Sequence, residues 1–143
     1  MGYDYHAQGT IKITPPIPAP ALRELQGPDL PVFCLADGVD DPEAAGPWSD
    51  MVGVWALVPA DVPLDLAQPV TVGALAMRIV SKRHSIHDPL SRFAELCHRA
   101  GRRLTSEVTF RGEDGEQGVI WVDESGEVVW AETVAPGRGT SCR

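Results

Sequence analysis

The sequence has 143 residues, of which 43% are hydrophobic and 22% are charged, and its formal net charge is −8. This length and composition fit one compact domain and exclude two full-sized domains, a fibrous repeat and wholesale disorder. The apolar stretches are far shorter than the ~20 residues of a membrane-spanning helix, so we expect a cytoplasmic protein with no membrane partner.

The charge is distributed unevenly along the chain. Residues 78–103 carry a net charge of +5, whereas the residues before and after them carry −8 and −5. An acidic chain repels nucleic acid at long range, so we do not expect it to bind duplexes. The basic segment has two interpretations: a solvated face whose Arg99, Arg102 and Arg103 complement the end of a helix, or a local anion site.

The first predicted element is a strand over residues 9–14, where Ile11 and Ile13 alternate with polar residues. Pro15 and Pro16 are expected to end it, because proline cannot donate to a strand ladder. A short helix with Leu22 and Leu25 on its buried face should follow.

The middle of the chain is rich in proline, and residues 27–50 and 61–69 are expected to be irregular loops. Residues 32–35 form one anchored or strand-like piece within the first loop. Residues 51–59 are apolar on both faces, which predicts a central strand. Residues 74–80 fit a strand, and a helix beginning near Thr71 is the competing interpretation.

The pattern over residues 89–100 predicts a helix with Asp88 as N-cap and Pro89 as its first residue. Leu90, Phe93 and Cys97 recur at helical spacing and form its buried face. The last third predicts three antiparallel strands, over residues 104–111, 119–122 and 127–134, joined by turns. Residues 135–143 have no apolar face and are expected to be a flexible tail.

This order of elements predicts a single α+β domain over residues 1–134. We expect two layers: a largely antiparallel sheet with two helices on one face, and a ferredoxin-like core to which a C-terminal strand is added.

Motifs at both ends of the chain resemble a family of small uncharacterised proteins from actinobacteria and their phages, a domain of unknown function. The motifs are Met1-Gly2-Tyr3, Gly9-x-Ile11-x-Ile13-x-Pro15-Pro16, Glu107-Val108-x-Phe110-x-Gly112-Glu113-Asp114, Gly118-x-Ile120-x-Val122 and Gly126-x-Val128. The resemblance covers about half of the chain. It implies an accessory protein often associated with mobile elements, and it carries over no activity.

The sequence offers little for catalysis or for a cofactor. Cys34, Cys97 and Cys142 are an odd number without a Cys-x-x-Cys spacing, which favours reduced thiols over a disulfide framework or a zinc site. His84 and His87 could share a metal ion, but they lack a metalloprotease frame and a fixed third ligand. No phosphate-binding glycine loop or nucleophile elbow occurs. We therefore expect no enzyme, no metal and no cofactor.

Surplus tryptophan favours a binding role. Trp121 and Trp130 flank one predicted hairpin, so they can form a cross-strand pair on one face, exposed or in the core. The leading hypothesis is a non-catalytic protein that contacts a partner protein or a second copy of itself, as in a homodimer, through the sheet face around Trp55, Trp121 and Trp130.

The alternative hypothesis is a small-molecule or nucleotide binder. Arg78, Lys82, Arg83 and His84 lie between a predicted strand and the predicted helix. Backbone amides and guanidinium groups could converge there on a phosphate-bearing ligand.

Overall fold

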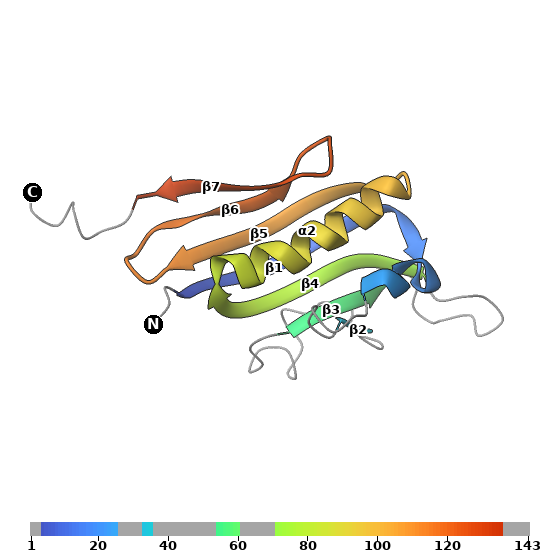
Figure 1. Ribbon diagram of the computed structural model, residues 1–143, viewed down its shortest axis with the longest axis horizontal. Helices are drawn as coiled ribbons and strands as arrows, with labels where there is room; N and C mark the ends of the chain where they lie inside the picture. Colours follow the sequence, from blue (N-terminus) through green and yellow to red (C-terminus); the bar gives the residue numbers. More distant parts are fainter. Residues whose placement is uncertain (1–3, 26–32, 36–53, 61–70, 136–143) are drawn as a thin grey trace, which may run out of the picture.

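The computed structural model describes residues 4–25, 33–35, 54–60 and 71–135 (Figure 1). The elements in chain order are β1 (Asp4–Pro18), the 3₁₀ helix η1 (Ala19–Leu25), β2 (Phe33–Leu35), β3 (Val54–Pro59), β4 (Thr71–Lys82), α2 (Arg83–Arg99), β5 (Arg103–Gly112), β6 (Gln117–Val122) and β7 (Val128–Val134). The expected loops lie outside the described residues, apart from β2 in the first of them. The expected tail lies outside them apart from Ala135.

The seven strands in the described part of the chain belong to one sheet with the order β2-β3-β4-β1-β5-β6-β7. Antiparallel pairing joins the six neighbours β3, β4, β1, β5, β6 and β7, and β2 adds parallel to β3 at one edge. The predicted α+β class with a largely antiparallel sheet is therefore confirmed. The three predicted C-terminal strands form the meander β5-β6-β7.

Strand β1 is longer than the sequence indicates, because Pro15 and Pro16 do not end it. Its pairing with β4 breaks between Lys12 and Ile17 and resumes at Ile17, which lies opposite Val72. Both prolines are exposed, at the irregularity where the missing amide hydrogen removes no regular ladder bond. The buried Ile17 explains why the strand continues.

The segment over residues 71–82 forms strand β4 and not the competing helix. It pairs with β3 on one side and with β1 on the other, so backbone ladders flank it on both edges. Leu75, Met77 and Ile79 alternate along it as buried residues. Burial at period two on a central strand outweighs the helical spacing of the same residues.

Helix α2 begins at Arg83, six residues before the predicted start, and Asp88 is not its N-cap. Lys82 holds the N-cap position without a side-chain capping bond, and Pro89 lies inside the helix. Ile86 accounts for the difference. It lies four residues before Leu90 and is fully buried, so it extends the apolar face of the helix by one turn.

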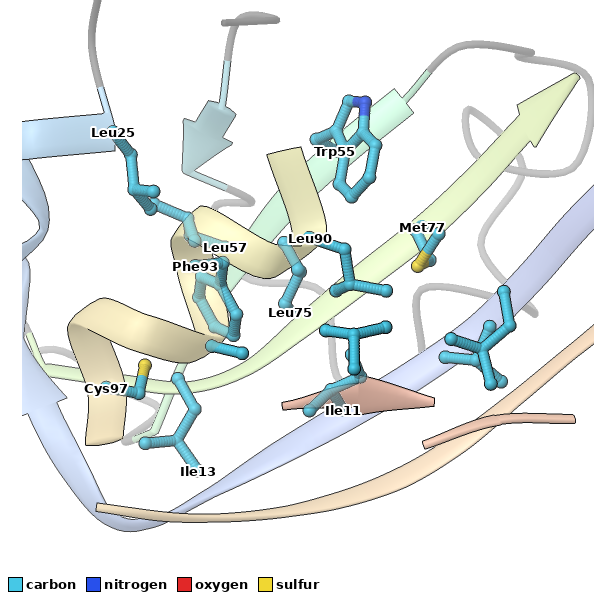
Figure 2. Packing of buried hydrophobic residues seen from close by; sticks show 14 of the residues in the cluster. Ile11, Ile13, Leu25, Trp55, Leu57, Leu75, Met77, Leu90, Phe93 and Cys97 are labelled. Atoms are coloured by element: carbon cyan, nitrogen blue, oxygen red, sulfur yellow. The ribbon is translucent and has the colours of Figure 1, made fainter. Parts of the chain in front are cut away.

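The core lies between α2 and the sheet face that it covers (Figure 2). Ile11 and Leu75 from the central strands pack opposite Leu90 and Phe93 of α2, and Leu25 of η1 packs beside them. Strand alternation turns the remaining side chains to the opposite side of the sheet, called the outer face below. On the outer face Ala56 and Ala76 are buried, whereas the side chains of β5 are exposed.

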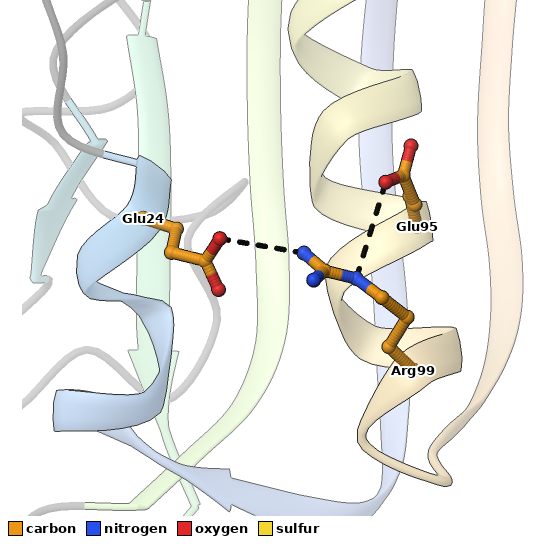
Figure 3. Close-up of polar contacts among 3 residues, drawn as sticks. All are labelled: Glu24, Glu95 and Arg99. Atoms are coloured by element: carbon orange, nitrogen blue, oxygen red, sulfur yellow. Dashed lines mark hydrogen bonds and ion pairs between the residues drawn. The ribbon is translucent and has the colours of Figure 1, made fainter.

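One arginine near the end of α2 joins the two helical elements (Figure 3). The guanidinium of Arg99 lies 3.5 Å from the carboxylate of Glu24 on η1 and 3.9 Å from that of Glu95. Glu95 and Arg99 are four residues apart on α2, the spacing that brings side chains together on one helix face. All three side chains are more than half exposed, so the contacts guide the approach of η1 and add little stability.

Candidate functional site

Trp55 is a core residue and not part of an exposed face. It is 3% exposed and lies opposite Met77 in the pairing of β3 with β4. That register turns it to the face covered by α2, where Leu57 is also buried. The prediction that Trp55 belongs to an exposed interface is wrong, because β3 presents its large side chains to the core.

Trp121 and Trp130 lie on opposite faces of their hairpin. Trp130 pairs with Ile120, and Trp121 pairs with Val129. Ile120 is 1% exposed and faces the core, so Trp130 shares its face and Trp121 points to the outer face. The predicted cross-strand pair of tryptophans is therefore wrong by one residue of register.

Trp130 connects the sheet to α2. Its ring centroid lies 5.0 Å from that of Phe110 and 5.6 Å from that of Tyr5. The guanidinium of Arg83 sits 4.6 Å above the Trp130 ring, and the indole Nε1 donates a 3.1 Å hydrogen bond to Nδ1 of His87. These contacts give Trp130 a structural role.

Three large apolar side chains are exposed among the described residues, and all lie on β6 and β7. Val119 is 37% exposed, Trp121 is 43% exposed and Val134 is 47% exposed. Val119 and Trp121 are two residues apart on β6 and both point to the outer face. Val134 pairs with Gln117 on the same face. We call these three residues the apolar strip.

The strip ends at an edge of the sheet, because β7 pairs with β6 and with no other described strand. The sequence of β7, Val-Val-Trp-Ala-Glu-Thr-Val, contains neither proline nor lysine, which commonly protect an edge strand. The pairing of β7 with β6 is irregular at one described position, where the register shifts between Gln117 and Gly118.

The four predicted anion-binding residues do not converge. Arg78 extends from β4 on the outer face, whereas Arg83 lies over Trp130 on the side of α2. Lys82 and His84 are exposed where β4 passes into α2. Arg78 and Arg83 therefore lie on opposite sides of the sheet, so a single phosphate cannot contact both.

Arg78 instead lines a hollow of about 600 Å³ on the outer face, together with residues of β1, β5, β6 and β7. His6 and Arg111 line the same hollow. Sequence reasoning missed both, although the alternation of polar residues along β1 and β5 indicates a solvent-facing side. We call this depression the outer-face hollow.

A second hollow, of about 570 Å³, lies near the end of α2 beside the β6–β7 turn. Of its lining residues, Arg102 donates through Nη1 to the carbonyl of Ala100 at 2.7 Å and through Nη2 to that of Pro16 at 3.2 Å. These bonds agree with the interpretation that Arg102 complements the end of the helix. Asp123 also lines this hollow, and its carboxylate accepts hydrogen bonds from Ser125 and Glu127 in the turn that follows it.

The residues considered for metal or nucleophilic chemistry are not assembled into a site. Within the described ranges, no group of three or more His, Cys, Asp or Glu side chains is placed to hold a metal ion. His87 accepts the bond from Trp130. Cys97 is fully buried in the core, as predicted, and burial raises the pKa of its thiol to about 12, against the opposing charge of Arg102.

Comparison of the sequence with protein-family models, with curated proteins and with solved structures found no match. Among the described residues, no helix is long and apolar enough to cross a membrane.

Proposed function

We propose that this protein is a non-catalytic binding protein that acts through contact with another protein, and that the apolar strip with the adjoining edge of β7 is its contact surface. The observation that carries the proposal is the clustering of Val119, Trp121 and Val134 on two neighbouring strands and one face. Contiguous exposed apolar surface of this kind marks interaction sites, and tryptophan is enriched among interface hot spots.

The outer edge of β7, with which no described strand pairs, suggests how the partner binds. An extended segment of another protein can add to an exposed edge strand through backbone hydrogen bonds, while side-chain contacts provide specificity. The outer-face residues of β6 and β7 would then line one side of the added strand.

Charge favours a different protein over a second copy of this chain as the occupant. Each copy has a net charge of −8, so two copies of this chain repel one another. Self-association through the same edge is the other outcome that the experiment below detects.

We infer further that the core is ferredoxin-like. Apart from the short edge strand β2, which lies between η1 and β3 in the chain, the order β1-η1-β3-β4-α2-β5 is the β-α-β-β-α-β sequence of that core and supports this inference. Strands β6 and β7 extend the sheet at the other edge. The ion pair between Arg99 and Glu24 supports a common face for η1 and α2.

The proposed setting is the cytoplasm, in keeping with the reduced thiols indicated by the odd cysteine count. The proposed biological role is that of an accessory protein of the bacterial and phage type. The motif resemblance at both ends of the chain is what supports it.

The test uses Trp121→Ala, which removes the largest side chain of the strip, and Arg92→Ala as control, which changes an exposed residue of α2. Sedimentation over a range of concentrations measures self-association. Tagged wild type and both variants serve as baits in a lysate of the native host, and each protein captured is then purified and titrated against the same three baits.

The proposal requires a purified protein that binds the wild type and Arg92→Ala alike and binds Trp121→Ala at least about tenfold more weakly. Concentration-dependent dimerisation lost only in Trp121→Ala would support contact with a second copy. A wild type that stays monomeric and captures no protein that discriminates between the two variants would contradict the proposal.

A further inference from the structure

We propose that the outer-face hollow is a binding site for a small organic phosphate, held between the guanidinium groups of Arg78 and Arg111. This site adjoins the contact surface proposed above and shares Val119 with it, but it is built around other side chains. It also differs from the anion site indicated by the sequence, since only Arg78 is common to both.

The strand register places four polar side chains next to one another in the hollow. Gln8 lies opposite Arg78 on one side of β1, and His6 lies opposite Arg111 on the other side. All four side chains line the hollow. The two arginines are thus separated by one strand and offset by two residues, which corresponds to about 12 Å between their Cα atoms in a regular sheet.

Two extended arginine side chains can span that distance from opposite sides. Their guanidinium groups can therefore approach one ligand group above β1, where His6 and Gln8 form the floor. Thr109 and Gln117, which also line the hollow, add hydroxyl and amide donors at its rim. The hollow is therefore lined by donors from the four neighbouring strands β4, β1, β5 and β6.

The electrostatics of the hollow are opposite to those of the whole chain. Among the residues that the structure describes, no acidic one lines it, although the chain has 20 Asp and Glu residues against 12 Lys and Arg. A concave surface whose charged residues share one sign concentrates the field and favours a ligand of the opposite sign. The hollow is therefore suited to an anion.

The arrangement and the size of the hollow indicate the kind of anion. A single carboxylate is satisfied by one bidentate arginine, whereas a phosphate has enough oxygens to accept from two guanidinium groups and from the floor at once. About 600 Å³ is the volume of a small-molecule site and far exceeds the ~30 Å³ of a water molecule. Val80 and Val119 offer apolar walls for the organic part.

Isothermal titration calorimetry with adenosine monophosphate, inorganic phosphate and adenosine tests the site. The variant is Arg111→Gln, and the matched control is Lys12→Gln, which removes an equal charge from the exposed residue Lys12 on the outer face of β1, outside the hollow. We expect adenosine monophosphate to bind more tightly than either of the other probes. Arg111→Gln should weaken it about tenfold or more, and Lys12→Gln less than about twofold.

Three results would overturn the inference: no heat from either phosphate probe at millimolar concentration, adenosine binding as tightly as adenosine monophosphate, or an equal loss of affinity in the two variants. Val119 belongs to both surfaces, but the side chains substituted in the two tests do not, because Trp121 does not line the hollow. Trp121→Ala should bind adenosine monophosphate as the wild type does, so either proposal can fail alone.

Discussion

Trp121 and Trp130 are close in the sequence and differ in every contact that matters for stability. Trp130 packs against Tyr5 and Phe110, lies under Arg83 and donates to His87, while Trp121 points from the outer face with 43% of its surface exposed. One tryptophan therefore serves the fold, and the other is available to a partner.

Replacing each tryptophan by alanine should separate these roles. Trp130→Ala removes an aromatic side chain from a packed cluster, and we expect it to lower the free energy of unfolding by about 3 kcal/mol. Trp121→Ala should change it by less than ~0.5 kcal/mol, as surface substitutions usually do. Urea denaturation followed by far-ultraviolet circular dichroism measures both. Equal losses in the two variants would show that the faces have been misassigned.

Gly9 marks a close approach between β1 and β5. A Cβ atom built on it would lie 2.1 Å from the carbonyl oxygen of Glu107, and its φ of +142° is one that L side chains rarely adopt. Gly9→Ala must therefore push the two central strands apart, and we expect a loss of at least ~3 kcal/mol in the free energy of unfolding.

Gly101 provides the matched control for this substitution. Its φ is +75°, but a Cβ there would meet nothing within 4 Å. Gly101→Ala carries backbone strain alone, which costs about 1 to 2 kcal/mol. Thermal unfolding of the two variants compares the effects, and a Gly9→Ala protein no less stable than Gly101→Ala would contradict the close approach.

The turn between β6 and β7 is organised by one carboxylate. Asp123 Oδ1 accepts hydrogen bonds from the hydroxyl of Ser125 at 2.6 Å, from the amide of Ser125 at 2.9 Å and from the amide of Glu127 at 3.0 Å. The bond from the Ser125 hydroxyl, followed by those from the backbone amides, lowers the pKa of Asp123 below its usual value of 3.8.

This depressed pKa predicts an acid-sensitive hairpin. The ionised carboxylate stabilises the folded turn fully above the unfolded pKa of about 4, and the contribution is lost as the pH falls through the lower folded-state pKa. Amide hydrogen exchange at Ser125 and Glu127 should therefore show protection that declines in acid. Asp123→Asn keeps an acceptor but cannot ionise, so a decline equally steep in that variant would rule out this origin.

Helix α2 shows where local patterns are insufficient. Asp88 and Pro89 have the residue types typical of a helix start. Capping preferences depend only on neighbouring residues, so they cannot indicate that Ile86 is buried in the core. Burying one large aliphatic side chain contributes ~1.5 to 3 kcal/mol, enough to offset much of the penalty for a proline inside a helix.

A pair of substitutions distinguishes the two helix starts. An N-cap replaced by alanine costs about 1 kcal/mol, so Asp88→Ala should have that effect only if the helix began there. Because Asp88 is exposed inside α2, we expect Asp88→Ala to change the free energy of unfolding by less than ~0.5 kcal/mol. Ile86→Ala should lower it by about 2 to 4 kcal/mol, and chemical denaturation measures both.

At the scale of the molecule, the alternation of Ile11 and Ile13 and the meander of the last three strands could be predicted from residue patterns alone. The face on which Trp130 lies could not, because its pairing with Ile120 depends on a register that one residue of slip would reverse. The order of the strands in the sheet could not be predicted from residue patterns either. His6 and Arg111 are far apart in the sequence, and only the pairing of β1 with β5 brings them together.

The central position of β1 also bears on how the protein is made. β1 leaves the ribosome before the other described elements, yet it lies between β4, which ends at Lys82, and β5, which ends at Gly112. Both edges of β1 therefore stay unpaired until β4 has been translated, and one edge stays unpaired until β5 follows. Pairing strands that are so far apart in the sequence slows folding. A nascent chain stalled before β5 exposes one side of its middle strand, which makes that interval the period when a chaperone is most useful.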